Sequence, residues 1–430
     1  MIQAPISILW LRRDLRLEDN RALDAAVRSG LPILLLFIFD PQILSELPAD
    51  DSRITFIHQS LRKLHDDLRS KGSALMIRQG NPREVWEQLL EEFTIAGVFA
   101  NRDYEPYAVE RDKAVARVLN ASGVPISFTK DQVIFDREEV IKADGTPYTV
   151  FTPYKKRWLE KYKQIASEIH KNYGPPAFIE ASWSFPEIEA LGFRPSAISA
   201  PPPNLTNIRA YEQYRDVPAL GATTLVGPHL RFGTISIREL ARQAEQESPV
   251  FLSELIWREF FMQILHHYPA LVTQSFKKVY DSIQWRNHEA DFQRWCRGET
   301  GYPLVDAGMR QLNQTGFMHN RIRMVVASFL CKHLLIHWSW GEAYFADKLL
   351  DYELSSNNGN WQWAAGTGCD AAPYFRVFNP SLQQQRFDPN LEYIRQWIPD
   401  YDPQRYIPPM VDHAMARVRA IQTYRAALSS

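Results

Sequence analysis

Cysteine is scarce in this sequence, and the few cysteines it has are far apart. Cys296, Cys331 and Cys369 form no CxxC pair. Cysteines paired at short spacing are the usual mark of a disulfide framework or a zinc site. The sequence therefore predicts neither of these, and three separate thiols suit a reducing cytosol.

Long apolar runs and a recognisable leader are also missing. No stretch of about 18 apolar residues occurs, which is the length needed to cross a bilayer. The first residues, Met1 to Pro5, lack the basic and apolar regions of a signal peptide. We therefore expect a cytoplasmic protein without a membrane span.

Neither sign of charge is in excess, because 49 Lys and Arg stand against 50 Asp and Glu, for a net charge of −1. Proteins that bind nucleic acids are often basic overall, so this balance argues weakly against such a partner. A local basic groove is still compatible with it, since phosphate charge is felt only over about 8–10 Å in physiological salt.

Aromatic residues, in contrast, are plentiful: they make up 12% of the chain and include 12 Trp. Large flat side chains fill helical cores, and they also line cofactor pockets and form platforms on which nucleobases stack. Composition alone favours the core.

The first 130 residues alternate short apolar runs with amphipathic stretches. Continuous apolar runs indicate strands buried on both faces of a parallel sheet, and we expect them at Ile6–Leu11, Leu31–Phe39, Ala74–Arg78, Gly97–Asn101 and Pro125–Thr129. Apolar residues at helical spacing predict helices at Ile54–Lys71, Arg83–Phe93 and Val109–Ala121. This alternation is typical of a doubly wound α/β domain. The domain has neither a GxGxxG motif nor a Walker A loop, so we do not expect a dinucleotide cofactor in it.

The rest of the chain has a different pattern. Prolines are frequent in residues 131–205, which we interpret as a linker with one helix at Tyr154–Lys171. After it the strand pattern disappears, and helices are predicted at Pro249–His266, Pro303–Gln314, Met318–Trp338 and Glu342–Leu349. The sequence thus predicts an α/β domain at 1–130, a linker at 131–205 and an all-α domain at 206–430.

Two loops combine polar residues in patterns typical of helix starts. Trp10 to Asn20 (WLRRDLRLEDN) follows the first strand and is a charged loop in which Asp19 or Asn20 could cap the next helix. Thr223 to Ser236 (TTLVGPHLRFGTIS) places hydroxyls and glycines before helical sequence. Such a segment can cradle a phosphate, although taken alone it is better explained by ordinary helix capping.

Two predicted helices place chemically active side chains on one face. In Leu252–Phe261, Glu254 and Trp257 are three residues apart and share a face, as a pocket lining or as a surface carboxylate beside a core Trp. In Phe317–Met324, Asn320, Arg323 and Met324 share a face. A buried Arg323 would need a partner, for which Asp351 is a candidate.

Together, and in this order, these segments and the stretches DYELSSNNGNWQW (351–363) and DAAPYFRVFNP (370–380) resemble the photolyase/cryptochrome family over nearly the whole chain. The resemblance implies an α/β domain joined by a long linker to a helical domain that holds FAD in a U shape. By this resemblance the residues that bind FAD are Tyr211, Thr223, Thr224, Gly227, Asn320, Arg323, Asp351, Glu353 and Asn357. Many members have Ser at the position of Gly227, and Asn357 occupies the place that faces flavin N5.

The subfamily is indicated by two positions. Members that repair cyclobutane pyrimidine dimers have Asn at the place of Asn357, whereas cryptochromes tend to have Asp or Cys there. Enzymes that repair (6-4) photoproducts have His where this chain has Asn320 and Met324. The resemblance therefore implies a dimer photolyase, with a cryptochrome light receptor as the alternative.

The implied reaction is light-driven electron transfer from FADH− to the dimer, and it requires no metal. The residues expected to act in catalysis are Glu254, Asn320, Met324 and Asn357. Those expected to contact the lesion or the DNA are Glu254, Trp257, Asn320, Arg321, Trp363 and Arg376. The tryptophans expected to carry electrons to the flavin are Trp285, Trp338 and Trp361, a role that is compatible with their alternative as core residues.

A second, light-harvesting chromophore is less well defined by the sequence. Members that bind folate carry an Asn-Glu pair where this chain has Tyr107-Ala108, which argues against folate. A deazaflavin, another flavin or no second chromophore all stay open. The expected partner is DNA that contains pyrimidine dimers, and the expected oligomeric state is a monomer.

Overall fold

Two compact units make up the chain, which passes between them more than once. The computed structural model describes residues 4–165 and 174–429. The α/β unit comprises Met1–Glu139, Trp158–Pro201 and Gly227–Gln243, and the helical unit comprises Val140–Arg157, Pro202–Val226 and Ala244–Ser430.

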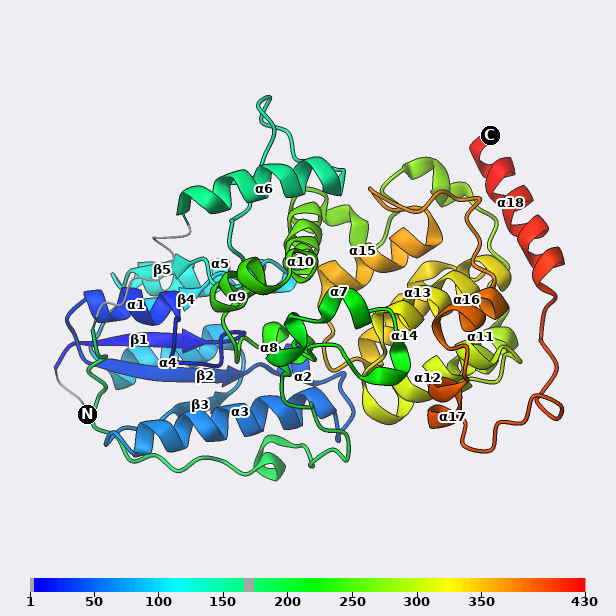
Figure 1. Cartoon of the computed structure of the whole chain (residues 1–430). Coiled ribbons are helices and arrows are strands. Elements are labelled where there is room, and N and C mark those ends of the chain that lie inside the picture. The colour runs from blue at the N-terminus through cyan, green and yellow to red at the C-terminus, as the bar shows by residue number, and fades with distance from the viewer. Residues whose placement is uncertain (1–3, 166–173, 430) are drawn as a thin grey trace. The chain divides into compact units, whose positions relative to one another are not determined.

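The α/β unit is built on a sheet of five parallel strands (Figure 1). The strands are β1 (Ile6–Leu11), β2 (Ile33–Phe39), β3 (Met76–Gln79), β4 (Ile95–Asn101) and β5 (Ile126–Thr129), in the order β3-β2-β1-β4-β5. All residues of β1 and β2 are buried, which explains why their sequences are apolar without alternation. All five predicted strands are confirmed, with ends that differ by two residues at most.

Helices cover both faces of this sheet, so the doubly wound architecture is confirmed. Its main helices are α1 (Arg21–Arg28), α3 (Ser52–Arg69), α4 (Pro82–Glu92) and α5 (Pro106–Ala121), with the short α2 (Pro41–Leu44) and α8 (Gly227–Arg231). Leu23 of α1 and Leu61 of α3 share one apolar cluster with Leu9 of β1. Trp86 of α4 and Val115 of α5 belong to the cluster on the other face.

Buried charges join the loop after β1 to residues far along the chain. Asp131 accepts hydrogen bonds from Nη2 of Arg16 at 2.8 and 2.9 Å and from Nη2 of Arg238 at 2.7 Å. Arg238 also binds Asp19 at 2.9 Å, so Asn20 alone caps α1, through hydrogen bonds from the amides of Ala22 and Leu23. The α/β unit therefore depends on ionic contacts that span more than a hundred residues.

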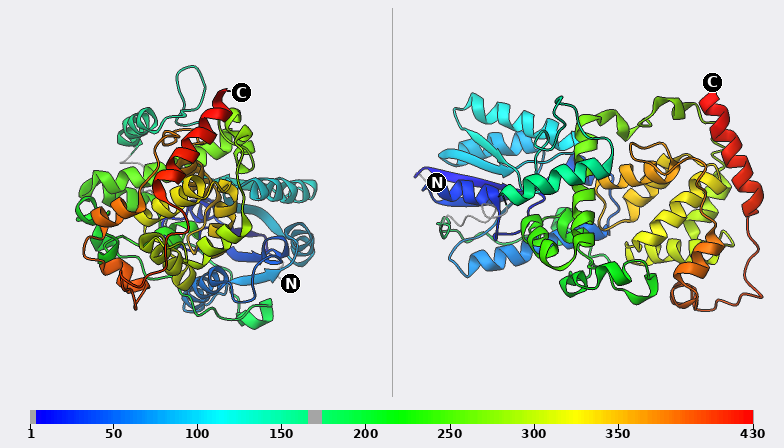
Figure 2. Two further views of the ribbon diagram at one scale, coloured as in Figure 1. Left: turned by 90° about the vertical axis from the view of Figure 1, so that its right-hand side faces the viewer. Right: turned by 45° about the horizontal axis from the view of Figure 1, so that its top comes forward.

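Beyond Thr129 the described residues contain no strand, and the helical unit consists of helices and loops (Figure 2). Besides α8, the helices that begin after the α/β sheet are α6 (Phe151–Ile165), α7 (Tyr211–Tyr214), α9 (Ile237–Glu247), α10 (Pro249–His267), α11 (Glu289–Arg297), α12 (Pro303–Thr315), α13 (Asn320–Ser328), α14 (Trp338–Lys348), α15 (Leu354–Ala365), α16 (Pro380–Phe387), α17 (Glu392–Trp397) and α18 (His413–Ser429). An all-α domain was expected here, and the helical character is confirmed.

One predicted helix, Met318–Trp338, is wrong as a single element. Helix α13 ends at Ser328 and continues only as one π-helical turn, η6 (Phe329–His333). Leu335 then adopts a positive φ of 50°, and α14 begins at Trp338. Because the residues on both sides of the break are apolar and buried, the periodicity gives no sign of it.

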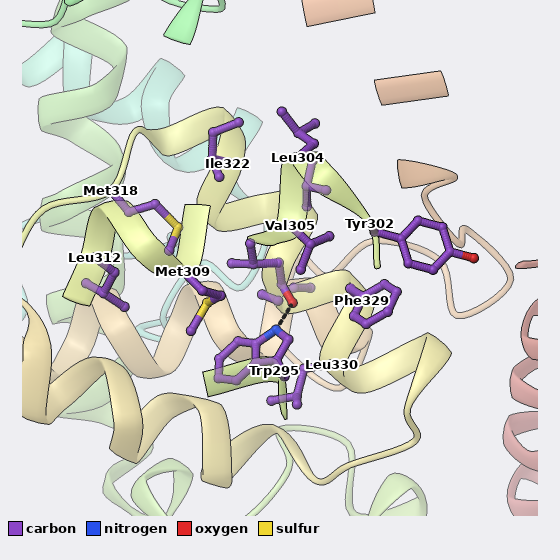
Figure 3. Close-up of a cluster of buried hydrophobic side chains, with 14 of the residues drawn as sticks. Trp295, Tyr302, Leu304, Val305, Met309, Leu312, Met318, Ile322, Phe329 and Leu330 are labelled. Atoms are coloured by element: carbon purple, nitrogen blue, oxygen red, sulfur yellow. Dashed lines mark hydrogen bonds between the residues drawn. The ribbon is translucent and has the colours of Figure 1, made fainter. Parts of the chain in front are cut away.

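The core of the helical unit lies around Trp295, whose indole N–H donates to the carbonyl oxygen of Val326 at 3.2 Å (Figure 3). Met309 and Leu312 of α12, Met318 of the following loop, and apolar side chains of α13 surround it. The hydrogen bond satisfies the polar atom of a Trp that is fully buried.

Two glycines let α15 lie directly against its neighbours. A Cβ atom at Gly341 of α14 would lie 2.1 Å from the Trp361 ring, and one at Gly359 of α15 would lie 2.2 Å from the Phe261 ring of α10. Any side chain at either position would force the helices apart.

The predicted linker at 131–205 is divided between the two units. Residues 140–157 belong to the helical unit because Phe151 and Tyr154, at the start of α6, are buried there beside Phe260 of α10. The predicted helix at Tyr154–Lys171 is present up to Ile165, and its remainder at 166–171 lies outside the described residues. Proline frequency indicated an irregular segment but not where its aromatic residues are buried.

No helix in the described part of the chain is both long enough and apolar enough to cross a membrane. In the same residues no three His, Cys, Asp or Glu side chains are grouped so as to hold a metal ion.

Removal of the Asp131 charge should destabilise the α/β unit. Replacement by Asn (D131N) leaves buried Arg16 without its counter-ion and Arg238 with Asp19 alone, which should lower the free energy of unfolding by about 3–5 kcal/mol. D50N is the control, because the Asp50–Arg194 pair is largely exposed and should contribute only about 0–1 kcal/mol. Urea unfolding measures both, and equal losses would show that burial of the Asp131 charge is unimportant.

Candidate functional site

Helix α13 presents a polar face and buries its other side. Asn320 is exposed and Arg321, Arg323 and Met324 are half-buried, while Ile322 and other apolar residues of the helix are buried. The predicted shared face of Asn320, Arg323 and Met324 is therefore available for binding.

His319 fixes the start of this helix. Its Nδ1 accepts a hydrogen bond from the amide of Arg321 at 3.1 Å, so the imidazole is the N-cap. Burial lowers the pKa of His319 to about 4, because the charged form is poorly solvated there. The imidazole is thus neutral at physiological pH and is not a ready proton donor.

The predicted partner of Arg323 is confirmed. Its Nη2 lies 2.9 and 3.2 Å from the two carboxylate oxygens of Asp351, and its Nε donates to the carbonyl of Met318 at 2.8 Å. Both side chains of the ion pair keep some exposed surface, 27% and 16%. The pair is therefore held rigidly but can still be reached by a bound molecule.

Asn357 on α15 is oriented by a residue that the sequence did not single out. Its Nδ2 donates to the carbonyl oxygen of Glu342 at 3.0 Å and to the Glu342 carboxylate at 2.8 Å. Both amide hydrogens are thereby used, and within the described residues Oδ1 has no hydrogen-bond partner, although Asn357 is buried. Burial raises the pKa of Glu342 above its usual value. No motif pointed to Glu342, because the contact arises only from the packing of α14 against α15.

The other predicted cofactor residues lie in separate segments of the chain, one before α15 and the rest between α7 and α8. Glu353 precedes α15, and its carboxylate accepts hydrogen bonds from Ser355 at 2.7 Å and Ser356 at 2.8 Å. Tyr211 begins α7, and burial raises the pKa of its hydroxyl. The backbone carbonyls of Thr223 and Thr224 accept from Asn207 and Asn204, while Gly227 is the first residue of α8 in the α/β unit.

The segment after α7 supplies counter-ions that the sequence analysis missed. Arg215 donates to Glu254 at 2.6 Å, and Asp216 accepts from Arg321 at 2.9 Å. Glu254 and Arg321 were both predicted to contact the substrate, so each would have to exchange or share an existing ionic partner. Their partners, Arg215 and Asp216, are adjacent in the sequence, but no motif in this segment indicates that they pair with the site.

The predicted aromatic walls and the second arginine differ in exposure. Trp257 and Trp363 are half-buried, on α10 and α15 respectively. Arg376 is exposed in the loop before α16, with its guanidinium 5.2 Å from the centre of the Phe378 ring. Of the two arginines predicted to bind phosphate, Arg376 therefore has the more accessible charge.

The three predicted electron carriers all lie in the helical unit. Trp361 and Trp338 are buried in its main apolar cluster, and Trp285 packs against the edge of that cluster. The His337 ring contacts two of them, and its centre lies 5.3 Å from that of the Trp285 ring and 5.1 Å from that of the Trp338 ring. Trp361 also contacts Trp295 at 6.1 Å. Both interpretations of the three tryptophans, core packing and electron transfer, therefore stay open.

Tyr107 and Ala108, which stand where folate-binding proteins have Asn and Glu, are engaged within the α/β unit. The Tyr107 hydroxyl donates to the carboxylate of Asp40, and Ala108 is buried.

Comparison with known proteins identifies both units. Residues 7–174 match the family model described as DNA photolyase, and residues 251–404 match the model described as the FAD binding domain of DNA photolyase. A deoxyribodipyrimidine photo-lyase of Agrobacterium fabrum is 35% identical, over 98% of each chain.

Solved structures agree with these matches. A class III photolyase from Agrobacterium tumefaciens has a TM-score of 0.88 and 34% identity, covering 100% of this chain and 99% of that one. An archaeal photolyase from Sulfolobus tokodaii, solved with two FAD molecules, has a TM-score of 0.82 and 32% identity, covering 98% and 99%. A Synechocystis cryptochrome follows with a TM-score of 0.81 and 25% identity, covering 98% and 100%.

The neutral state of His319 predicts a specific pH dependence. Because its pKa is lowered on folding, His319 contributes stability above its unfolded pKa, and this contribution is lost as pH falls through about 6 toward 4. H319N keeps a capping side chain but cannot take up a proton. Between pH 7 and pH 5 the free energy of unfolding should therefore fall more steeply for the wild type than for H319N, and parallel curves would contradict the assignment.

Proposed function

The chain belongs to the DNA photolyase family, and we propose that it repairs cyclobutane pyrimidine dimers in DNA with blue light. It is then a carbon–carbon lyase that uses FAD. The observation that carries this proposal is the buried Asn357, whose amide hydrogens are both taken by Glu342.

FAD, in its reduced form, supplies the light-driven electron that opens the cyclobutane ring. We propose that Arg323, Asp351, Asn357 and Asn320 surround the flavin and adenine together with Glu353, while Tyr211, Thr223, Thr224 and Gly227 hold the phosphates. The fit rests on the side-chain carbonyl oxygen of Asn357, which has no hydrogen-bond partner among the described residues although the residue is largely buried. Such an acceptor suits the N5–H of a reduced flavin.

The orientation of Asn357 favours repair over light sensing. Since Glu342 holds the amide hydrogens, only the carbonyl oxygen can face the flavin, and an amide cannot supply the proton that an Asp would. The higher identity to the class III photolyase than to the cryptochrome, 34% against 25%, points in the same direction.

The lesion is proposed to bind as an extruded dinucleotide. Glu254 and Asn320 would hydrogen-bond the bases, Trp257 and Trp363 would stack on them, and Met324 would pack against the dimer. A dimer is already poorly paired, so extruding it costs less than extruding normal bases. His319, neutral and used as a helix cap, offers no general acid for (6-4) chemistry.

Electron supply to the flavin, contacts with the DNA backbone and a second chromophore complete the proposed function. We propose that Trp361, Trp338 and Trp285 carry electrons to oxidised flavin, that Arg321 and Arg376 contact phosphates, and that the protein acts as a cytoplasmic monomer. A second chromophore is compatible with the two FAD molecules of the Sulfolobus tokodaii photolyase, and its identity stays open, with folate disfavoured by Tyr107-Ala108.

A direct test of the function is illumination of the reduced holoprotein with an oligonucleotide that contains one thymine dimer. Recovery of base absorbance under blue light, and none in the dark, is the expected result. Normal flavin photochemistry without recovery would favour the light receptor, and purified protein without any flavin would reject both.

Loss of the Glu342 side chain should change how the flavin is protected. In E342L the Asn357 amide keeps only the backbone carbonyl of residue 342 as its acceptor, so its orientation toward N5 is held less firmly and reduced flavin should be oxidised by air several-fold faster than in the wild type. E342Q keeps an acceptor oxygen for the Asn357 amide and should stay close to wild type. Flavin absorbance followed in the dark measures both rates, and equal rates in E342L and E342Q would refute the role of Glu342.

Removal of the exposed Arg376 charge should reduce the salt dependence of DNA binding. Each lost phosphate contact lowers the slope of log K against log salt by about 0.7–0.9. R405A is the matched control, because Arg405 is 88% exposed and lies outside the proposed site. An unchanged slope for R376A, measured by titration at several salt concentrations, would exclude Arg376 from phosphate binding.

A further inference from the structure

One face of Trp257 is covered by a side chain from outside its own helix. The rings of Phe151, the first residue of α6, and Trp257 lie 3.6 Å apart between centroids and only 8° from parallel. Phe260 meets Trp257 edge-on at 5.6 Å, and the Phe261 ring lies 5.5 Å from it between centroids, tilted by 28°. Trp257 is nevertheless half-buried rather than buried, so part of the indole stays exposed beside these rings.

Attraction between the two rings does not by itself explain this arrangement. Aromatic pairs prefer offset or edge-to-face geometries over a direct sandwich. A nearly parallel pair at so short a centroid distance must therefore be imposed by the backbone and side chains that hold each ring.

Three contacts hold Phe151 in place. Its backbone N–H donates to the carboxylate of Asp370 at 3.0 Å, which anchors the first residue of α6. One turn later, Lys155 donates to Ser253 of α10 at 2.5 Å, and the Tyr154 ring packs on Phe260 at 5.2 Å. Because positions 151, 154 and 155 share one face of a helix, these contacts fix α6 along α10.

We propose that Phe151 is a positioning residue for lesion binding: it supports the buried face of Trp257 so that the indole stands ready to stack on an extruded base. The inference rests on the proposed function, in which Trp257 is a wall of the lesion pocket. A supported indole binds better because it is already ordered, so less side-chain entropy is lost when the base binds. Asp370 acts indirectly, because it holds the backbone N–H of Phe151, the residue that carries the supporting ring.

The test compares affinity for single strands with and without a thymine dimer, using holoprotein and fluorescence anisotropy at one salt concentration. Stacking on an aromatic side chain contributes about 5–150-fold in affinity per base, and F151A should lose part of this, about 5–10-fold, for the dimer only. F151Y restores a flat ring and should stay within about twofold of wild type by the same reasoning. V150A is the matched control, because Val150 directly precedes Phe151 and is 46% exposed.

A second variant keeps the test valid if F151A fails to fold. F151L retains an apolar side chain of similar volume but no flat face, and it should show the same selective loss. For Asp370, the D370A variant should weaken dimer binding, whereas D370N keeps an acceptor for the Phe151 amide and should restore it.

A double-mutant cycle separates the inference from the function on which it rests. If Phe151 acts through Trp257, F151A should have no further effect in a W257A background. An equal loss with and without Trp257, or an equal loss for undamaged DNA, would overturn the inference. If W257A itself left dimer affinity unchanged, the proposed role of Trp257 would fail instead.

Discussion

The close approach of α15 to α10 and α14 is the constraint on which the helical unit depends. At Gly341 and Gly359 the neighbouring ring lies where a Cβ atom would be, so both positions require glycine. This contact sets the register of three helices at once. Glu342, next to Gly341, is thereby brought to Asn357, and the ring of Trp361 is held against α14. Small residues at the contact thus position the large and polar residues around it.

Within this frame the polar side chains of the site are arranged as pairs. Arg215 with Glu254, Arg321 with Asp216, and Arg323 with Asp351 each neutralise one charge with another. All three pairs keep part of their surface exposed, which limits the desolvation cost of holding charges inside the fold. Charges paired in this way offer directed hydrogen bonds without a large net charge, which agrees with the balanced composition of the whole chain.

The sequence predicted those features that depend on neighbouring residues. Continuous apolar runs located the five strands, and helical spacing placed Asn320, Arg323 and Met324 on one face. The pairing of Arg323 with Asp351 could be predicted because a half-buried guanidinium needs an acidic partner, and the motifs around it contain few acidic residues. The proposed binding residues themselves came from family resemblance, since their types alone fit ordinary caps and core residues as well.

The features that escaped prediction arise where distant segments meet. Glu342, Arg215 and Phe151 have ordinary sequence surroundings, and their roles depend on which helix packs beside them. The break at Leu335 was hidden for a different reason: the buried environment continues across it, so the apolar pattern continues too.

The ion pairs around Asp131 also have a consequence for how the protein is made. Arg238 follows Asp131 by 107 residues, so at a translation rate of about 5–20 residues per second it emerges from the ribosome about 5–20 s later. During this delay the first strands and helices exist without the segment that completes their charge network, while residues 140–157 await helices not yet synthesised. The nascent chain therefore cannot finish its amino-terminal unit as an independent early step, and completion of that unit is tied to translation of more than half of the polypeptide.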